Sequence, residues 1–271
     1  MPDSNPVVLV TGTSSGFGRA TAELLASRGM RVYGTTRGAP DNTGAYTVIT
    51  MNVDDDDSVN AAVALVLETE GRIDVVVNNA GIGVAGSIED TSMEEAKQQM
   101  ETNFFGVARV TRAVLPHMRE RRSGKIINIS SIGGLIALPF QAYYSASKFA
   151  VEALTEALRL ELKPFGIQVC CIEPGDFRTE MTDKRIFARA ADSKAYGAQM
   201  KRTVDAYAED ERTGSDPVLV AQLVERLIAE RNPKIRYMVG AASQKAAGML
   251  KRFISSRMYE RLLQQHCKID S

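Results

Sequence analysis

Short apolar runs alternate with amphipathic stretches of helical length along most of the chain, and this alternation constrains the fold most. Runs such as VVLV, IDVVV and KIINI are rich in β-branched residues and apolar almost throughout, which is typical of parallel strands buried on both faces. Strands joined through helices by short connections form a doubly wound sheet. The sequence therefore predicts a single α/β domain over residues 1–271, Rossmann-type, with a mostly parallel sheet of about seven strands and helices on both faces.

The alternation also predicts where the elements lie. Strands are expected near Val7–Thr11, Arg31–Thr35, Tyr46–Met51, Ile73–Asn78, Lys125–Ser130, Gln168–Glu173 and Tyr237–Val239. Helices are expected over Gly16–Ser27, Ser58–Glu70, Met93–Arg121, Ala142–Lys163 and Pro217–Ala229.

Composition excludes several classes of function. Lysine plus arginine equals aspartate plus glutamate at 33 each, so no overall field favours nucleic acid or a membrane. No apolar run is long enough to predict a membrane span, and the N-terminus lacks the pattern of a signal peptide, so we expect a cytoplasmic protein. With three cysteines and two histidines, a disulfide framework, a histidine-based triad or a histidine-rich metal site has too few residues, and we expect no metal.

A glycine-rich turn follows the first predicted strand directly and leads into the first predicted helix. It reads Thr11-Gly-Thr-Ser-Ser-Gly-Phe-Gly18. Glycines let such a turn approach a pyrophosphate closely, while the helix N-terminus offers free amides and a partial positive charge. This context, a strand before and a helix after, predicts a dinucleotide-binding turn.

The spacing of this turn, T-G-x-x-x-G-x-G, resembles that of the short-chain dehydrogenase/reductase family, and the similarity extends over roughly residues 6–240. The sequence NNAG at 78–81 is similar to the family motif that supports the sheet beside the adenine side of the cofactor. Asn103 matches the family's structural and catalytic asparagine. INISS ends at Ser130 and Ser131, where the family has its catalytic serine, and Pro174-Gly175 with Thr179 resembles the segment beside the nicotinamide.

The resemblance implies an NAD(P)-dependent oxidoreductase acting on CH–OH groups, similar to the hydroxysteroid and retinol dehydrogenase-like branch. It also implies a set of cofactor contacts that includes two catalytic residues, Tyr144 and Lys148. The expected cofactor-binding residues are Gly12, Thr13, Ser14, Ser15, Gly16, Phe17, Gly18, Arg37, Asn52, Val53, Asn79, Ala80, Gly81, Tyr144, Lys148, Pro174, Gly175 and Thr179.

Two adjacent tyrosines compete for the catalytic role. Tyr144 stands four residues before Lys148, and residues at i and i+4 share a helix face. Tyr143 stands five before it, about 140° further round the helix, so it cannot point into the same site. A nearby ammonium favours phenolate and lowers a phenol pKa from its usual value of about 10, which suits a group that exchanges protons with substrate.

The resemblance assigns further roles. Lys148 would also hydrogen-bond the nicotinamide ribose and, with Asn103, continue a proton relay through water. Ser131, 13 residues before Tyr144, would hold the substrate oxygen against the phenol. We assign Ser130 to the strand end.

The end of the second predicted strand bears on the type of cofactor. NAD-binding proteins place an acid there for the ribose 2′-hydroxyl, whereas this chain has Thr36 and then Arg37. A guanidinium can bind a 2′-phosphate bidentately. Ser15, however, replaces the basic residue that many NADP users carry before the second glycine. We expect NADP(H) to be preferred and NAD(H) to be possible.

The substrate side is apolar. Leu135–Phe140 and the segment 176–215, a predicted lid, carry many apolar side chains, which favours a small lipophilic alcohol or ketone contacting Ser131, Leu138, Phe140, Tyr144 and Phe177. These side chains could equally seal the lid to the domain. A 3-oxoacyl thioester reductase is the alternative within the family, and a dinucleotide sensor without catalysis is the alternative outside enzymes.

Residues 243–268 form a basic segment in which apolar residues recur at helical spacing. Such a helix can lie on a membrane surface, so weak peripheral membrane contact through 243–268 is one interpretation. We favour packing on its own domain or on another subunit, and expect a homodimer or homotetramer.

Overall fold

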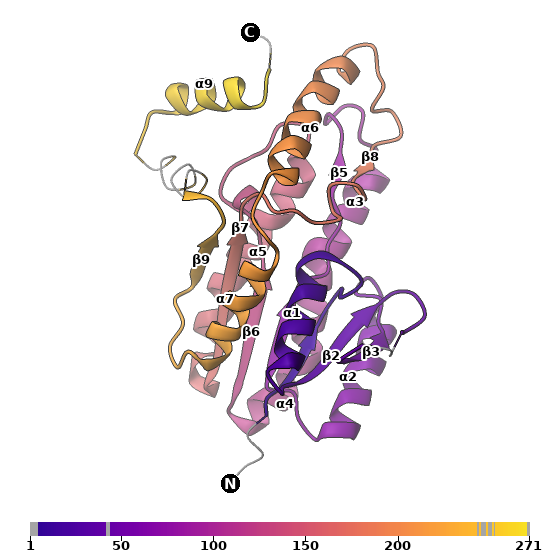
Figure 1. Cartoon of the computed structure of the whole chain (residues 1–271), viewed down its shortest axis with the longest axis vertical. Helices are drawn as coiled ribbons and strands as arrows, with labels where there is room; N and C mark the ends of the chain where they lie inside the picture. Colours follow the sequence, from indigo (N-terminus) through magenta and orange to yellow (C-terminus); the bar gives the residue numbers. More distant parts are fainter. Residues whose placement is uncertain are drawn as a thin grey trace.

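The computed structural model describes residues 5–41, 44–242, 244, 248, 251 and 253–269. Seven parallel strands form one sheet in the order β3-β2-β1-β4-β6-β7-β9 (Figure 1). They are β1 (Val7–Val10), β2 (Arg31–Thr36), β3 (Thr47–Thr50), β4 (Val75–Asn78), β6 (Gly124–Ile129), β7 (Ile167–Pro174) and β9 (Arg236–Val239). The strand order reverses between β1 and β4, the place where doubly wound sheets bind ligands. The predicted fold class is confirmed.

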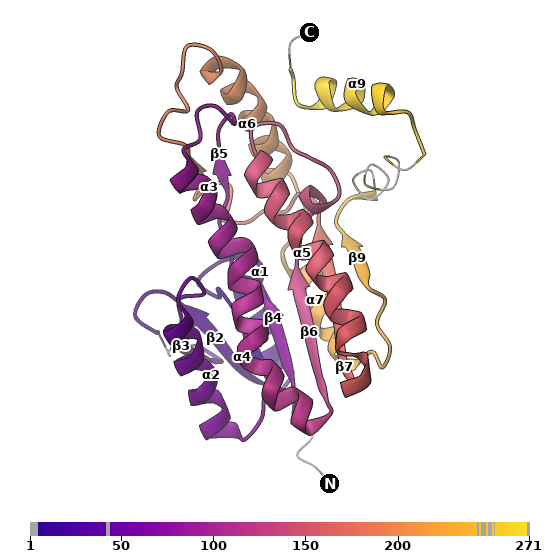
Figure 2. The ribbon, with the colours of Figure 1, turned by 180° about the vertical axis from the view of Figure 1, so that it is seen from behind.

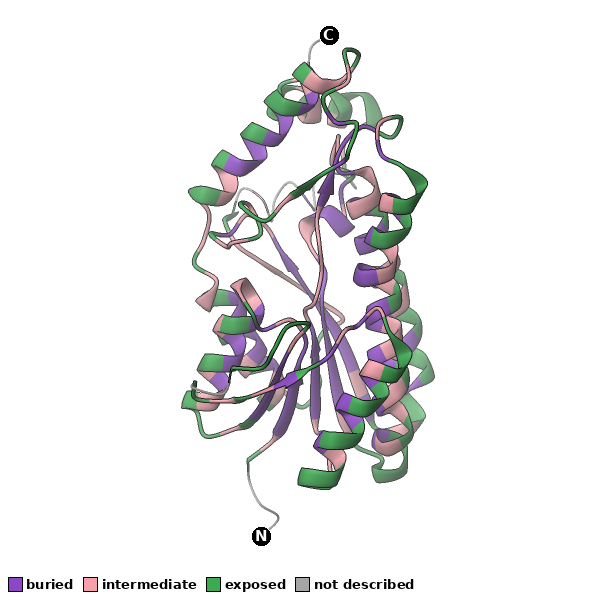
Figure 3. Cartoon of the chain, turned by 90° about the vertical axis from the view of Figure 1, so that its right-hand side faces the viewer, coloured by how far each residue is buried: buried purple, intermediate pink, exposed green. Residues whose placement is uncertain are grey.

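Alternation of buried side chains explains why these strands need helices on both faces. Val7 and Leu9 of β1 join the core cluster with residues of α2 (Asp56–Glu70), α4 (Gly106–Arg121) and α5 (Ala142–Glu161). Val8 and Val10 join the opposite cluster with residues of α1 (Gly16–Ser27) and α7 (Val218–Ala229). Figures 1 and 2 show these two layers from opposite sides, and Figure 3 shows the buried strands between them.

The predicted helix over 93–121 is interrupted. It consists of α3 (Met93–Met100), a π-helical turn at Glu101–Phe105, and α4. Such turns occur often at functional sites, and this one carries Asn103.

The predicted lid contains structure that the sequence pattern did not indicate. Strand β8 (Ile186–Phe187) pairs with β5 (Val84–Ala85) in a small second sheet. Helix α6 (Gly197–Arg212) follows, and its Met200 and Val204 pack with Val84 in a satellite core.

The C-terminal segment is described in part. Residues 243, 245–247, 249, 250 and 252 of the predicted basic stretch lie outside the described residues. Helix α9 (Ser256–His266) has no buried residue, and it lies at the same end of the molecule as α6 (Figure 1). Cys267, just after it, is buried: its carbonyl accepts a hydrogen bond from Thr203 Oγ1 (2.8 Å) and its Sγ lies 3.1 Å from the Tyr207 hydroxyl. Over the described residues, no helix is both long and apolar enough to cross a membrane.

Candidate active site

The glycine-rich turn is tightly built against the end of β4. Gly12 has φ +70°, and a Cβ there would lie 2.9 Å from the Cα of Ala80. The Asn79 amide nitrogen donates to the carbonyls of Thr11 and Gly12, both at 2.9 Å, and the Thr11 hydroxyl accepts from the backbone N–H groups of Asn79 and Ala80. The 78–81 motif therefore supports the turn on the side of β4.

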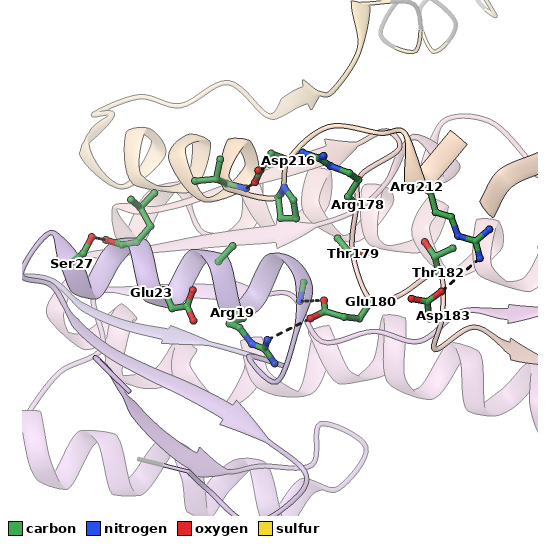
Figure 4. Close-up of a pocket in the computed structure, with 15 residues that line it drawn as sticks. Arg19, Glu23, Ser27, Arg178, Thr179, Glu180, Thr182, Asp183, Arg212 and Asp216 are labelled. Atoms are coloured by element: carbon green, nitrogen blue, oxygen red, sulfur yellow. Dashed lines mark hydrogen bonds and ion pairs between the residues drawn. The ribbon is translucent and has the colours of Figure 1, made fainter. Parts of the chain in front are cut away.

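The N-terminus of α1 already holds an anionic group. The Gly16 N–H donates to a carboxylate oxygen of Glu180 at 2.9 Å, and Arg19 lies 3.5 Å from the other oxygen (Figure 4). Ser15, the residue before the helix, makes no side-chain cap. The Gly16 N–H thus has no partner within its own helix and donates to an anionic group from another segment, as the N–H groups of a phosphate-binding helix end do.

Beside this helix end lies a cavity of about 790 Å³ between α1 and the segment after β7 (Figure 4). Its lining includes three arginines, Arg19, Arg178 and Arg212, but also the acids Glu23, Glu180 and Asp183. Tyr144 does not line it, so this cavity adjoins the anion-binding turn and is separate from the tyrosine.

At the ends of β2 and β3 lie the residues expected near the adenosine. Thr35 Oγ1 accepts from the Gly12 N–H at 3.2 Å. Arg37, directly after β2, is exposed. Asn52 accepts from the Asp54 N–H, and Val53 is buried against Gly106 of α4. Arg37 is therefore the cation at this strand end that a ligand can reach.

Tyr144 and Lys148 lie together on α5. The ammonium nitrogen of Lys148 is 5.8 Å from the centroid of the Tyr144 ring and donates to the carbonyl of Ile129 at 2.9 Å. Lys148 is buried, and its ammonium is anchored to the carboxyl end of β6. This anchoring fixes the lysine beside the phenol.

The two serines after β6 are placed differently. Ser131 lies near enough to Tyr144 to lower the pKa of its phenol, and both side chains pack against Gly133, whose N–H donates to Ser131 Oγ at 3.0 Å. Ser130 is buried, with its hydroxyl packed beneath Gly134 and without a hydrogen-bond partner among the described residues. The structure brings Ser131, and not Ser130, to the phenol.

Asn103 reaches the same helix from the π-helical turn. Its Oδ1 accepts from the Ile82 N–H at 2.8 Å, and its Nδ2 donates to the Ile82 carbonyl (3.0 Å) and to Ser147 Oγ (3.1 Å). Ser147 in turn donates to the Tyr144 carbonyl at 2.7 Å. These bonds connect Asn103 to the backbone that carries the tyrosine, and among the described residues no hydrogen bond joins Asn103 directly to Lys148.

Burial dominates the electrostatics of this pair. Burial raises the pKa of the Tyr144 phenol, Ser131 opposes that shift, and the negative charges of Glu211 and Asp176 add to it. Burial lowers the pKa of Lys148 to about 8, against the attraction of Glu152, which raises it. At neutral pH the phenol is therefore protonated, while the lysine ammonium retains most of its charge.

The expected substrate residues lie in three different settings. Phe140 has φ +59°, a strained conformation for a side chain of this size, and its ring packs on the satellite core below α6. Leu138 is partly buried and its backbone N–H donates to Ser145 Oγ. Phe177 is buried, with its ring edge-on to Phe17 at 5.1 Å, so it packs in the core between α1 and α7.

Sequence reasoning missed a polar group of residues on this side. Asp176, Arg185 and Glu211 all act electrostatically on Tyr144. Arg185 forms an ion pair with Glu211, and Thr182 donates to the same carboxylate at 2.6 Å. The position of Asp176, directly after Pro174-Gly175, was a signal that could have identified it.

The comparisons with known proteins agree with this geometry. The family described as short chain dehydrogenase matches residues 6–189. A 3-ketodihydrosphingosine reductase of Bacteroides thetaiotaomicron is 42% identical over 255 residues, covering 94% of this chain and 95% of that protein.

Three solved structures extend the comparison. A short-chain dehydrogenase from Streptomyces avermitilis is 34% identical with a TM-score of 0.82, covering 99% and 98% of the two chains. An enzyme from Burkholderia phymatum in complex with NAD is 25% identical (TM-score 0.78, 95% of each chain). Actinorhodin polyketide ketoreductase with NADPH is 32% identical (TM-score 0.73, 87% of this chain and 95% of that chain).

Proposed function

Since the chain belongs to the short-chain dehydrogenase/reductase family and is an oxidoreductase acting on CH–OH groups, we propose a specific reaction for it. It interconverts a lipophilic ketone and the corresponding secondary alcohol, with NADP(H) as the preferred cofactor. The observation that carries the proposal is the convergence of Ser131, Tyr144 and Lys148 at the carboxyl end of the sheet. Ketone reduction requires three things of the protein: a hydrogen bond that holds the carbonyl oxygen, a proton donor and a nearby positive charge. These three residues can supply them.

The residues of the turn fit a nicotinamide dinucleotide. The amide of Gly16 binds the Glu180 carboxylate, so this helix end has the donor and the field that a phosphate needs. The turn from Gly12 to Gly18, braced by Asn79, would hold the pyrophosphate, and Thr179 lies beside Gly16. When bound, the cofactor supplies a hydride to the carbonyl carbon or removes one from the alcohol.

The chain's own residues handle the proton. Tyr144 donates its phenolic proton to the carbonyl oxygen, which Ser131 holds by a second hydrogen bond. Lys148 stabilises the phenolate that remains, because its ammonium is fixed next to the ring. Asn103 fixes the helix backbone at Tyr144 through Ser147, and we retain for it the family role in a water-mediated relay from Lys148.

The preference for NADP(H) is supported by Arg37, which is exposed at the end of β2 where no carboxylate follows Thr36. A charged hydrogen bond contributes ~1.5–3 kcal/mol, or roughly 10- to 150-fold in affinity. We expect Arg37→Ala to erase a preference of that size while leaving the affinity for NADH unchanged, as measured by titrating both reduced cofactors. Equal binding of NADPH and NADH by the wild-type protein at low salt would contradict the assignment.

The substrate class is supported by the relative named 3-ketodihydrosphingosine reductase, since that name denotes a long-chain ketone. The two proteins are similar over nearly the whole length of both chains. A 3-oxoacyl thioester reductase is the second candidate, because actinorhodin polyketide ketoreductase has the same fold. A panel containing 3-ketodihydrosphingosine, a steroid ketone and acetoacetyl-coenzyme A, followed by loss of NADPH absorbance, tests the two. Turnover of the thioester alone would favour the second candidate, and no turnover of any ketone, with cofactor still bound, would favour a sensor.

We also propose that the protein is a homo-oligomer and that it resides in the cytoplasm. Sedimentation of the purified protein tests the first of these proposals.

A further inference from the structure

Asp176 is held at the catalytic end of the sheet, immediately beyond β7. Its backbone N–H donates to Gln244 Oε1 at 3.0 Å, and its carbonyl accepts from the Ser215 N–H at 3.0 Å. One carboxylate oxygen accepts a hydrogen bond from the Gln244 side-chain amide. Because β7 is the direct neighbour of β6, whose end leads to Ser131, Asp176 lies on the same rim of the sheet as the catalytic groups.

The surroundings of Asp176 carry an excess of negative charge. Asp210 and Glu211 both act on its carboxylate, and Arg185 is the one cation that acts on it with them. The guanidinium of Arg185, however, already pairs with Glu211, and its side chain is only 6% exposed. In the part of the chain that the structure describes, no ion pair within 4 Å reaches Asp176 itself.

The negative charges around Asp176 change the pKa of its carboxyl group. Burial, followed by Asp210 and Glu211, raises the pKa of Asp176 to about 7, while Arg185 opposes the shift. Asp176 also acts on the Tyr144 phenol and on Tyr207 of α6, and Glu211 acts on the same phenol, so the carboxylates lie on the side of the site that faces Tyr144. Asp176 has the Gln244 amide but no cationic partner within 4 Å among the described residues, and a cationic group on the substrate would supply one.

We propose that Asp176 binds the ammonium group of an amino ketone whose amine lies next to the carbonyl that Tyr144 protonates, which makes Asp176 a specificity-determining residue. The inference rests on the proposed function, since it concerns the same substrate site. It also gives a chemical meaning to the similarity with the reductase of 3-ketodihydrosphingosine, a ketone with an amine on the adjacent carbon. The apolar side chains of the site would then accommodate the alkyl chain, while Asp176 identifies the head group.

A purely structural role for Asp176 is the competing explanation, because its bonds with Gln244 tie the C-terminal segment to β7. The two roles differ in what they do to different substrates. Loss of an anchor would slow turnover of every ketone alike, whereas loss of an ammonium partner would affect the amino ketone selectively.

The test compares 3-ketodihydrosphingosine with the same long-chain ketone lacking the amine, using the full chain and NADPH. Asp176→Asn keeps the shape of the side chain and an oxygen for the Gln244 amide. We expect it to lower kcat/KM for the amino ketone by roughly 10- to 150-fold, mainly through KM, and to leave the deaminated ketone within a factor of about two. Asp176→Glu should recover part of the loss.

Asp205→Asn is the matched control, since Asp205 is an exposed acid on α6, in the same segment, that pairs with Lys201 at 2.8 Å. It should change neither substrate. An equal loss on both ketones in Asp176→Asn, or no loss on the amino ketone, would overturn the inference while the proposed function stands. Failure of the wild-type protein to reduce either ketone would instead overturn the proposed function, and the inference with it.

Discussion

Replacing Arg236 with methionine should destabilise the fold strongly. This residue begins β9, and its Nε lies 2.8 Å from Glu152 Oε2 and 3.4 Å from Glu173 Oε1, while its Nη2 pairs with Glu156. Glu152 and Glu173 are only 4% and 2% exposed. Methionine keeps much of the aliphatic stem but leaves two buried carboxylates facing each other without their cation. Breaking a buried ion pair in this way costs about 3–5 kcal/mol.

Urea unfolding, followed by circular dichroism at neutral pH, measures this loss as a lower midpoint with an unchanged slope. Arg28→Met is the matched control, because Arg28 makes an ion pair with Glu225 at 2.9 Å with side chains that are 57% and 30% exposed. That surface pair should contribute no more than about 1 kcal/mol. Equal losses in the two variants would refute the electrostatic reasoning.

Three further predictions concern the site. Tyr144→Phe should abolish turnover while cofactor affinity, measured by fluorescence titration, stays within a few-fold; Tyr143→Phe should retain most activity, and the reverse pattern would exclude the i, i+4 argument. Because burial lowers the pKa of Lys148 to about 8, ketone reduction should fall above about pH 8, and Lys148→Arg should lack that decline in its pH–rate profile. Truncation before Ser243 removes the contacts of Gln244 and Cys267; it should raise KM or alter sedimentation before it alters cofactor binding, and liposome flotation lost on truncation would favour the membrane interpretation.

The sequence predicted the sheet well because its strands are buried on both faces and their side chains repeat at short range. The bounds of α1 were predicted without error, since the glycine-rich turn before it and the end of its apolar periodicity at Ser27 are local signals. The interruption at Glu101–Phe105 was not predicted. It coincides with a tertiary contact, in which the Asn103 side chain bonds the Ile82 backbone and Ser147 Oγ.

The sequence motifs predicted which residues form the site, but they did not predict which charged groups surround the catalytic tyrosine. The spacing of Tyr144 and Lys148 is visible in the sequence, whereas the charges on Asp176, Arg185 and Glu211 meet only because the segment after β7 folds back over the sheet end. The pairing of β5 with β8 depends on the same segment, and two-residue strands give no periodic signal. Apolar side chains in this segment suggested lipophilicity alone, so the polar part of the substrate site required the structure.

The surroundings of Tyr144 act on its proton in opposite directions. Burial and the carboxylates of Glu211 and Asp176 raise the pKa of the phenol, while Ser131 and Arg185 lower it. The ammonium of Lys148, next to the ring, is expected to favour the phenolate as well. A phenol that keeps its proton at neutral pH is ready to donate it, which is the requirement of ketone reduction; alcohol oxidation requires a base. Asp176→Asn would remove the small contribution of Asp176 for every ketone alike, so only the difference between the amino ketone and its deaminated analogue reports the ammonium contact.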